Sequence, residues 1–213
     1  MSKEHMENML DGKILFRNLP YFKKLDDKAR GDKNEGSHID SPSNLVTLTF
    51  RQGSTHGNFS FINSLKYPEK VFIFCLSEKY DNTLYKAFNS DVCIQINNAQ
   101  EFFQLCKCSF NKIRSLKFDK ETGLINKKVE YFEYNKRTEG NVKDPCCIPF
   151  FKHQSFSNQK EYRLIFGKRW AFKKLQQEIV TRDYRELNQY DGSEKEFLNI
   201  GDIRKIVTVK TLK

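Results

Sequence analysis

The chain has 213 residues, a formal net charge of +10 and 38% hydrophobic residues, among them 19 Phe and 9 Tyr. This length suits a single domain with a substantial core, to which the aromatic side chains supply much of the apolar area. No apolar run approaches the roughly 20 residues that cross a bilayer, so we expect no membrane contact. The excess positive charge favours an anionic partner, most simply nucleic acid, with acidic protein or membrane surfaces as alternatives. A lysine-rich composition spread over a solvated surface would explain the charge without a partner.

The N-terminal segment "MSKEHMENML" lacks the basic head, apolar centre and small cleavage residues of a signal peptide, which favours a cytoplasmic protein. The spacing of the six cysteines, with one C-x-C and one adjacent pair, lacks the C-x2-C pairing of common zinc sites. We therefore expect reduced thiols and no metal site.

The first half of the chain predicts short elements separated by polar turns. Apolar and β-branched residues indicate strands over Lys13–Phe16 and Asn44–Phe50, and Tyr21–Ala29 can form two helical turns before Gly31 and Gly36 open a loop. "GSTHGNFSF" predicts a turn followed by an edge strand. The continuous apolar run within Lys70–Ser77 predicts a strand covered on both faces.

The second half predicts helices and strands in alternation. We expect helices at Asp81–Phe88, at Asn98–Phe110 and in the polar stretch Lys173–Asn188, and strands at Val92–Ile96, 128–134, Glu161–Phe166 and 203–212. This order has few parallel crossovers and therefore favours an α+β domain, a mixed or split sheet with packed helices. No phosphate-binding G-x-x-x-x-G-K-S/T or G-x-G-x-x-G pattern occurs.

The loop after the first strand mixes charges of both signs. Asp27, Arg30, Asp32 and Glu35 can form an ion-pair network that holds this loop, and Arg17 can offer two donors to a phosphate or carboxylate. A solvated charged turn is the alternative. A metal-dependent nuclease built on the three acids is disfavoured because basic residues are interleaved with them.

Two further segments carry candidate chemistry. Ser77 leaves the apolar strand at its carboxyl end, where ligand-binding residues often lie, but no acid and histidine pair identifies a hydrolase. In "FSNQKEYRLIF", alternation places Gln159, Glu161 and Arg163 on one face of the strand. A carboxylate there could stabilise a developing cation such as an oxocarbenium ion; a surface Glu–Arg pair is the alternative.

Four segments in order resemble a group of bacterial and phage proteins: "ILFRNLPYFKKLDDKARGDKNEG", "FCLSEKYDNTLYKAF", "VEYFEY" and "FFKHQSFSNQKEYRLIF". In that group an F-x-D-x-x-E-like loop, a C-x-S strand end and an E-x-E/K-E-[YW]-R strand recur in this order. The group is similar to the ADP-ribosyltransferase fold, whose members include toxins and phage-defence effectors. The likeness covers roughly residues 13–167 and implies one domain over 1–213, with a C-terminal helix and strand over 168–213.

The resemblance assigns roles to individual residues. It implies that Glu161 is the catalytic carboxylate, that Gln159 completes a Q-x-E turn found in enzymes that modify asparagine or guanine bases, and that Asp27, Asp32 and Glu35 shape the NAD cleft. The cofactor-binding candidates are Arg17, Asn18, Tyr21, Arg30, Ser77 and Tyr85, with either tyrosine stacking on nicotinamide. There is no clean S-T-S strand, because "GSTHG" and "CLSE" match it only in part.

We therefore predict a mono-ADP-ribosyltransferase that uses NAD as a substrate. The charge and the Q-x-E pattern favour a nucleic-acid acceptor, RNA or single-stranded DNA, because a base must be unstacked before its ring atoms are reached. Such a toxin would need an antitoxin or inhibitor protein. A protein acceptor and a non-catalytic nucleic-acid-binding module on the same fold are the alternatives.

Overall fold

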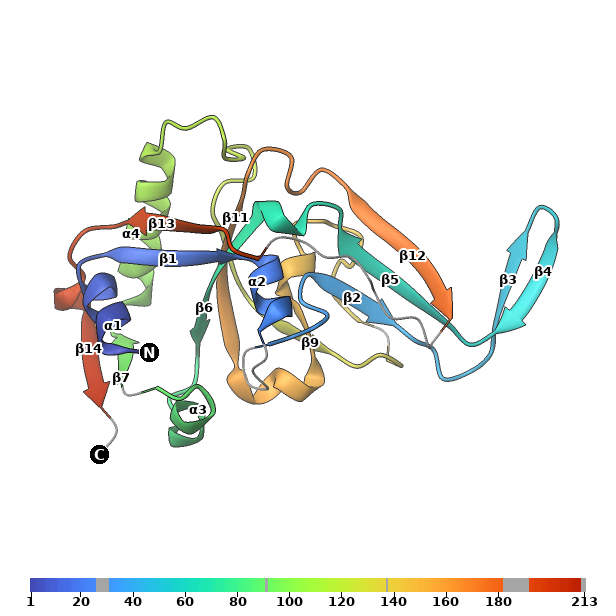
Figure 1. Ribbon diagram of the computed structural model, residues 1–213, viewed down its shortest axis with the longest axis horizontal. Helices are drawn as coiled ribbons and strands as arrows, with labels where there is room; N and C mark the ends of the chain where they lie inside the picture. Colours follow the sequence, from blue (N-terminus) through green and yellow to red (C-terminus); the bar gives the residue numbers. More distant parts are fainter. Residues whose placement is uncertain (26–30, 91, 137, 182–191, 212–213) are drawn as a thin grey trace.

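A computed structural model describes residues 1–25, 31–90, 92–136, 138–181 and 192–211 (Figure 1). The chain is α+β and its central element is a five-stranded antiparallel sheet. Its strands, in spatial order, are β13 (Lys195–Asn199), β1 (Lys13–Asn18), β6 (Val71–Ser77), β11 (Glu161–Gly167) and β8 (Ile125–Lys128). The helices are α1 (Lys3–Leu10), α2 (Leu19–Lys24), α3 (Asn82–Ala87) and α4 (Ala99–Lys112).

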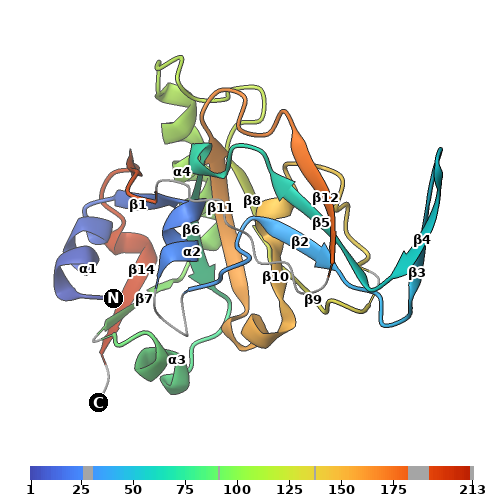
Figure 2. The same cartoon turned by 45° about the vertical axis from the view of Figure 1, so that its right-hand side comes forward.

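Smaller sheets surround the central one. A second antiparallel sheet has the order β12 (Leu175–Thr181), β5 (Phe59–Leu65), β2 (Ser37–Asp40). Three pairs complete the strands: antiparallel β14 (Val207–Thr211) with β7 (Val92–Ile96), parallel β10 (Phe151–His153) with β9 (Glu130–Phe132), and antiparallel β3 (Val46–Phe50) with β4 (Gly53–Gly57). The β3–β4 hairpin projects beyond the end of the β12–β5–β2 sheet, on the side away from the central sheet (Figures 1 and 2).

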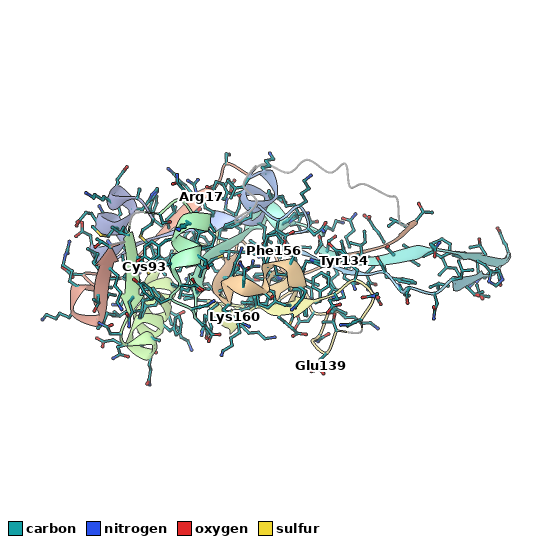
Figure 3. The ribbon with its side chains drawn as sticks, turned by 90° about the horizontal axis from the view of Figure 1, so that it is seen from below. Arg17, Cys93, Tyr134, Glu139, Phe156 and Lys160 are labelled. Atoms are coloured by element: carbon teal, nitrogen blue, oxygen red, sulfur yellow. The ribbon has the colours of Figure 1, made fainter. Side chains whose placement is uncertain are left out.

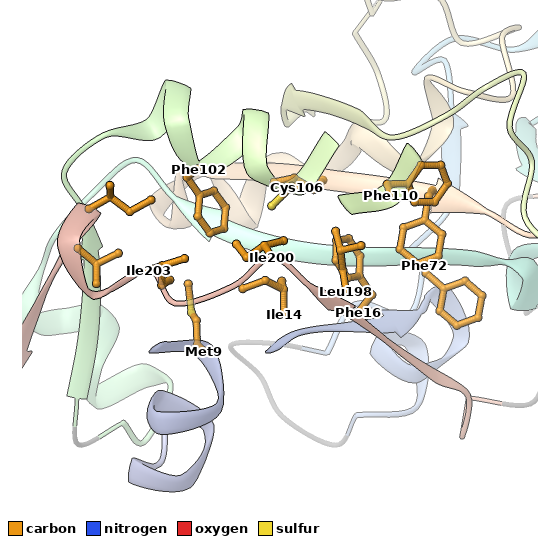
Figure 4. Packing of buried hydrophobic residues seen from close by; sticks show 14 of the residues in the cluster. Met9, Ile14, Phe16, Phe72, Phe102, Cys106, Phe110, Leu198, Ile200 and Ile203 are labelled. Atoms are coloured by element: carbon orange, nitrogen blue, oxygen red, sulfur yellow. The ribbon is translucent and has the colours of Figure 1, made fainter. Parts of the chain in front are cut away.

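Helix α4 covers one face of the central sheet. Phe102, Cys106 and Phe110 recur at intervals of four residues and are all fully buried, so they form one apolar stripe. This stripe packs on the strand side chains of a cluster that includes Phe16 and Phe72 (Figure 4). The Asn98 side chain accepts a hydrogen bond from the Glu101 backbone N–H and caps the start of the helix.

The opposite face of the central sheet is apolar in only one half. Ile73 and Ile165 pack there against Leu19, Phe150 and Phe151 in a second buried cluster. Beyond Ile73, the residues of β6 on this face become exposed, so the expectation of cover on both faces holds for Val71–Ile73 but not for Cys75 and Ser77. Only the β6 part of this half is uncovered, because the polar side chains of Glu161 and Arg163 on the neighbouring β11 are buried.

Several expected elements were wrong or misplaced. The polar stretch after Lys173 forms strand β12, not a helix, because pairing along β5 outweighs its helix-forming composition; the rest of the expected helix, 182–191, lies outside the described residues. The segment Gly53–Gly57 is itself a strand, and β5 is the middle strand of its sheet, not an edge.

The boundaries at the two ends of the chain also differ from expectation. Helix α2 begins at Leu19, with Pro20 in its first turn, and ends at Lys24. The C-terminal segment contributes β13 to the central sheet beside β1, so this part of the chain completes the sheet that carries Glu161. No helix in the described ranges is long and apolar enough to cross a bilayer.

Candidate functional site

A buried chain of charges runs across the start of β11. Arg163 donates to Glu161 (Nε to Oε2, 2.7 Å) and, with both terminal nitrogens, to Glu35 (2.6 and 3.0 Å). Lys152 from β10 donates to the other Glu161 oxygen and to Gln159 Oε1 (3.1 Å). The structure therefore brings Glu35, Gln159, Glu161 and Arg163 together. Strand alternation is confirmed for Glu161 and Arg163, but Gln159 ends a 3-10 helix (Gln154–Gln159) before the strand, so the expectation that it lies on the strand was wrong.

Burial and neighbouring cations act in opposite directions on Glu161. Burial favours the neutral acid, but the charges of Arg163 and Lys152 outweigh it and lower the pKa of Glu161 to about 2. Glu161 is therefore a carboxylate at any physiological pH. The pKa of Arg163 is raised well above its usual value because Glu161 and Glu35 overcome the cost of burying it.

Asp32 adds a third carboxylate to this cluster. Its Oδ1 accepts a hydrogen bond from the Asn34 backbone N–H (2.9 Å). Burial and the neighbouring Glu35 raise the pKa of Asp32 to about 6. Three carboxylates face two cations, so the cluster has one excess negative charge when Asp32 is ionised and none when it is protonated.

A strained turn holds Gln159 and Glu161 in place. Lys160 between them has φ = 46°, a left-handed conformation that is uncommon for a residue with a side chain. The backbone N–H of Glu161 donates to Tyr131 Oη (2.9 Å), and Ser77 Oγ donates to the Gln159 carbonyl (2.7 Å). Figure 3 shows Lys160 and Phe156 on this turn, well away from the β3–β4 hairpin.

Three predicted residues lie on one face of adjacent strands. Ser77 is opposite Glu161, and Arg17 is opposite Ile73, which in turn is opposite Ile165. Directly opposed residues point to the same face, so Arg17 on β1, Ser77 on β6 and Glu161 on β11 share the face that opens beyond the second core. Strand geometry separates the Arg17 and Glu161 Cα atoms by about 16 Å.

The exposed Cys75 thiol lies on this face between Arg17 and Glu161. Cys75 is opposite Arg163 in the ladder and precedes Ser77 by two residues. We name the strip formed by Arg17, Cys75, Ser77 and Glu161 the sheet-face site; its β6 residues are exposed, whereas Arg17 is half-buried and Glu161 is only 7% exposed. Tyr21 borders it, because the Arg17 guanidinium lies 4.6 Å from the centre of the Tyr21 ring.

Two other cofactor-binding candidates lie outside the sheet-face site. Asn18 is fully buried at the start of α2. Tyr85 is buried on α3 and donates from its hydroxyl to the Lys210 carbonyl (3.2 Å). The structure therefore places Tyr21, and not Tyr85, beside Arg17.

Tyr85 lines a separate pocket of about 770 Å³ beyond the end of β6. Its walls come mainly from the end of β6 with the loop that follows it and from β7, and include Tyr80, Phe103 and Tyr162. Tyr162 and Glu161 are consecutive in β11 and so point to opposite faces of the sheet. The pocket therefore lies across the sheet from Glu161, although Ser77 and Cys75 also border it.

Lys152 and Tyr131 are the site residues that sequence reasoning missed. Lys152 is 3% exposed, and its ammonium group is 4.5 Å from the centre of the Phe156 ring. A lone lysine within the apolar run "CCIPFFKH" was the available signal, since a buried lysine requires a partner. Tyr131 gave no such signal in an alternating strand.

The remaining predicted residues lie outside the geometry described. Asp27 and Arg30 fall in 26–30, which the structure does not describe. Within the described ranges, no three His, Cys, Asp or Glu side chains are grouped so as to hold a metal ion.

Comparisons with protein-family models, curated proteins and solved structures find no match to this chain.

Proposed function

We propose that the protein is a mono-ADP-ribosyltransferase that cleaves NAD at the sheet-face site and transfers ADP-ribose to a nucleic acid, preferentially RNA. The observation that carries this proposal is the alignment of Arg17, Ser77 and Glu161 on one face of three adjacent strands, with Glu161 fixed as a carboxylate. The likeness to the ADP-ribosyltransferase fold belongs to the same proposal.

NAD would lie along the sheet-face site. The Arg17 guanidinium suits the pyrophosphate, and the adjacent Tyr21 ring suits stacking on a planar ring of the cofactor. Glu161 would then accept a hydrogen bond from the nicotinamide ribose. The roughly 16 Å between the Arg17 and Glu161 Cα atoms leaves room for their side chains to contact different parts of one dinucleotide.

The reaction needs negative charge beside the ribose. The bond between ribose C1′ and the nicotinamide nitrogen breaks, nicotinamide leaves as a neutral molecule with the bonding electron pair, and positive charge develops on the ribose. The excess negative charge of the Asp32, Glu35, Glu161, Lys152 and Arg163 cluster stabilises that charge. A nitrogen or oxygen of the acceptor then bonds to C1′ and loses its proton to water.

The buried ion pairs hold Glu161 without using all of its acceptor capacity. Each carboxylate oxygen binds one cation, and an ionised carboxylate has about four lone-pair positions. Lys152 and Arg163 therefore act as positioning residues for Glu161, and Glu35 positions Arg163 through its paired bonds. Such fixed geometry is what electrostatic catalysis requires.

The acceptor and the partner follow from the charge and from the proposed activity. A net charge of +10 supports a polyanionic acceptor, for which RNA or single-stranded DNA offers unstacked bases. An enzyme that modifies such a target in its own cell needs an antitoxin or inhibitor protein. A protein acceptor is the alternative that the experiment below separates.

The test incubates the protein with NAD labelled in the adenylate part, together with total RNA, single-stranded DNA or cell extract, and follows both nicotinamide release and transfer of label. Glu161→Gln should reduce both by at least about 100-fold. Glu35→Gln is the matched control, because it also removes one carboxylate from Arg163 but leaves Glu161 in place; it should retain measurable turnover.

A steric pair of variants tests the location. Cys75→Trp places a large side chain on the strip between Arg17 and Glu161 and should block NAD, whereas Cys108→Trp changes another exposed cysteine, on α4, and should not. Label only on protein would replace the nucleic-acid acceptor. If the wild type releases no nicotinamide under any condition, the transferase proposal fails and a non-catalytic binding module replaces it.

A further inference from the structure

A basic and aromatic surface lies at the opposite end of β11 from Glu161. The segment "KRWAFKK" follows this strand directly and carries four basic residues around the chain's single tryptophan. Three backbone hydrogen bonds tie neighbouring segments to it: Lys168 to the Lys70 carbonyl (2.8 Å), Arg169 to Lys117 (2.7 Å) and Lys66 to Lys174 (3.3 Å). Each of these segments adds another lysine.

We name as the Trp170 surface the exposed residues Lys66, Lys117, Arg169, Trp170, Lys173 and Lys174. The guanidinium of Arg169 lies 4.9 Å, and the ammonium of Lys173 5.8 Å, from the centre of the Trp170 ring. Lys117 pairs with Glu196. Among the described residues, Lys66, Arg169, Lys173 and Lys174 have no acidic partner, so their charge is available to a ligand.

The backbone presents Trp170 to solvent at a conformational cost. Trp170 has φ = 70°, which is unusual for a bulky residue, and is 49% exposed. The adjacent Ala171 and Phe172 are buried against Gly167, where any side chain would collide with them. The turn is thus anchored from inside while its largest side chain points outward, although burying the indole would be more favourable for stability alone.

We infer that the Trp170 surface binds single-stranded nucleic acid, with a base stacked on the indole and the surrounding cations on phosphates. Exposed aromatic rings and tracking positive charge are the two features by which proteins bind single strands without reading a sequence. Arg169 and Lys173 beside the ring add cation–π attraction and phosphate contacts at one position. Lysine charge alone would bind any polyanion. Stacking of a base on the indole is therefore the contact that selects nucleic acid over other polyanions.

The location of the Trp170 surface suits the docking of the acceptor of the proposed transferase. This docking role rests on the proposed function. Six residue steps along β11 separate Glu161 from Gly167, a distance of about 20 Å. Figure 1 shows the loop that follows β11 and the turn that precedes it at opposite ends of this strand. A single-stranded segment of several nucleotides can bind the Trp170 surface while a more distant base reaches Glu161 at the other end of β11.

The test measures binding without NAD, so its result does not depend on the transferase proposal. Fluorescent 15-mers of U and of dT are titrated with the wild type, Trp170→Gly, Trp170→Phe and Phe50→Ala. Trp170→Gly should weaken binding about tenfold, and Trp170→Phe should restore most of it because a ring remains. Phe50→Ala removes an aromatic side chain of similar exposure from the distant hairpin and should have no effect.

A second set of variants tests the cations. Lys66, Lys173 and Lys174 changed together to Gln should reduce the slope of log affinity against log salt by about 2, since each phosphate contact in a single strand contributes about 0.7. The control removes the same charge from exposed Lys3, Lys86 and Lys107 on α1, α3 and α4 and should leave the slope within about 0.5 of the wild type.

Polyglutamate serves as the probe for an acidic protein partner. Equal binding of U and dT 15-mers, or stronger binding of U, supports the inference and states whether the ribose 2′-hydroxyl contributes. Unchanged oligonucleotide binding by Trp170→Gly, with thermal melting showing that the variant is folded, would overturn it. So would polyglutamate affinity that equals the oligonucleotide affinity and shows the same dependence on Trp170.

Discussion

The two ends of β11 use arginine in opposite ways. Arg163, near the start, is 1% exposed and binds two carboxylates and the Pro149 carbonyl in fixed geometry. Arg169, just past the end, is exposed and lies over an exposed indole. The comparison teaches that burial decides what a charge does: the buried guanidinium positions another residue, whereas the exposed one remains available to a ligand.

Removing each arginine should give the largest contrast between the two ends. Arg163→Leu leaves Glu35 and Glu161 buried without their common partner and should reduce the free energy of unfolding by about 3–5 kcal/mol. Arg169→Leu should change it by no more than about 0.5 kcal/mol, because nothing buried depends on it. Denaturant unfolding of the two variants and the wild type measures both values.

A double variant checks the cause. Adding Glu35→Gln to Arg163→Leu removes one of the uncompensated carboxylates, so it should recover part of the lost stability. If Arg163→Leu and Arg169→Leu destabilise the protein equally, or if the double variant is the least stable of all, the buried cluster is not organised around Arg163 as described.

The pH dependence of turnover should reflect Asp32 and not Glu161. Glu161 has a pKa of about 2 and stays ionised, whereas Asp32, with a pKa of about 6, becomes protonated below that pH and neutralises the excess charge of the cluster. Nicotinamide release should therefore fall about tenfold from pH 7 to pH 5. Asp32→Asn should flatten this profile; a profile unchanged by the substitution would assign it to another group.

The same carboxyl should affect stability in the opposite direction. The pKa of Asp32 is raised in the folded state from 3.8 to about 6, so its contribution to stability is greatest below pH 4 and declines as the pH rises to about 6. Burial lowers the pKa of His38 from 6.5 to about 4. The contribution of the neutral His38 to stability is therefore lost as the pH falls from about 6.5 to about 4. Comparing the wild type with Asp32→Asn at each pH isolates the Asp32 effect.

The smallest expected effect lies at the other end of β11. Trp170→Gly relieves a left-handed backbone conformation that glycine adopts without steric cost. Glycine also adds entropy to the unfolded chain, so the two effects should leave the free energy of unfolding within about 0.5 kcal/mol of the wild type. A loss of more than about 2 kcal/mol would mean that the indole has a structural role. The binding test would then rely on Trp170→Phe and not on Trp170→Gly.

Strand alternation was sufficient to predict the core of the candidate site. The shared face of Glu161 and Arg163 follows from a period of two along β11, and the structure joins them by an ion pair. Gln159 reaches the same cluster through a hydrogen bond from Lys152, but from a 3-10 helix and not from the strand that alternation assumed. The expected ionic role of Glu35 also followed from its position in a charged loop. Its specific partner did not, because Arg163 is 128 residues away and only the fold brings them together.

Two kinds of information were not accessible from local pattern. Strand β12 has the leucine, glutamine and glutamate content of a helix, and only its seven-residue pairing with β5 makes it a strand. Tyr21 and Tyr85 could not be separated by residue type, because the choice depends on which face of the sheet each one lies. Lys152 was hidden for a similar reason: its role requires β10 to lie beside the start of β11.

The β3–β4 hairpin has a consequence for the modularity of the chain. Strands β2 and β5 already pair with each other, Asp40 opposite Phe61, so the residues between them form an insertion within an otherwise simple hairpin. Ser41 and Ser60 close its base through a hydroxyl hydrogen bond of 2.6 Å. The domain is thus topologically complete without this arm, which makes the arm a natural position for replacement by a short turn or by a graft of another sequence.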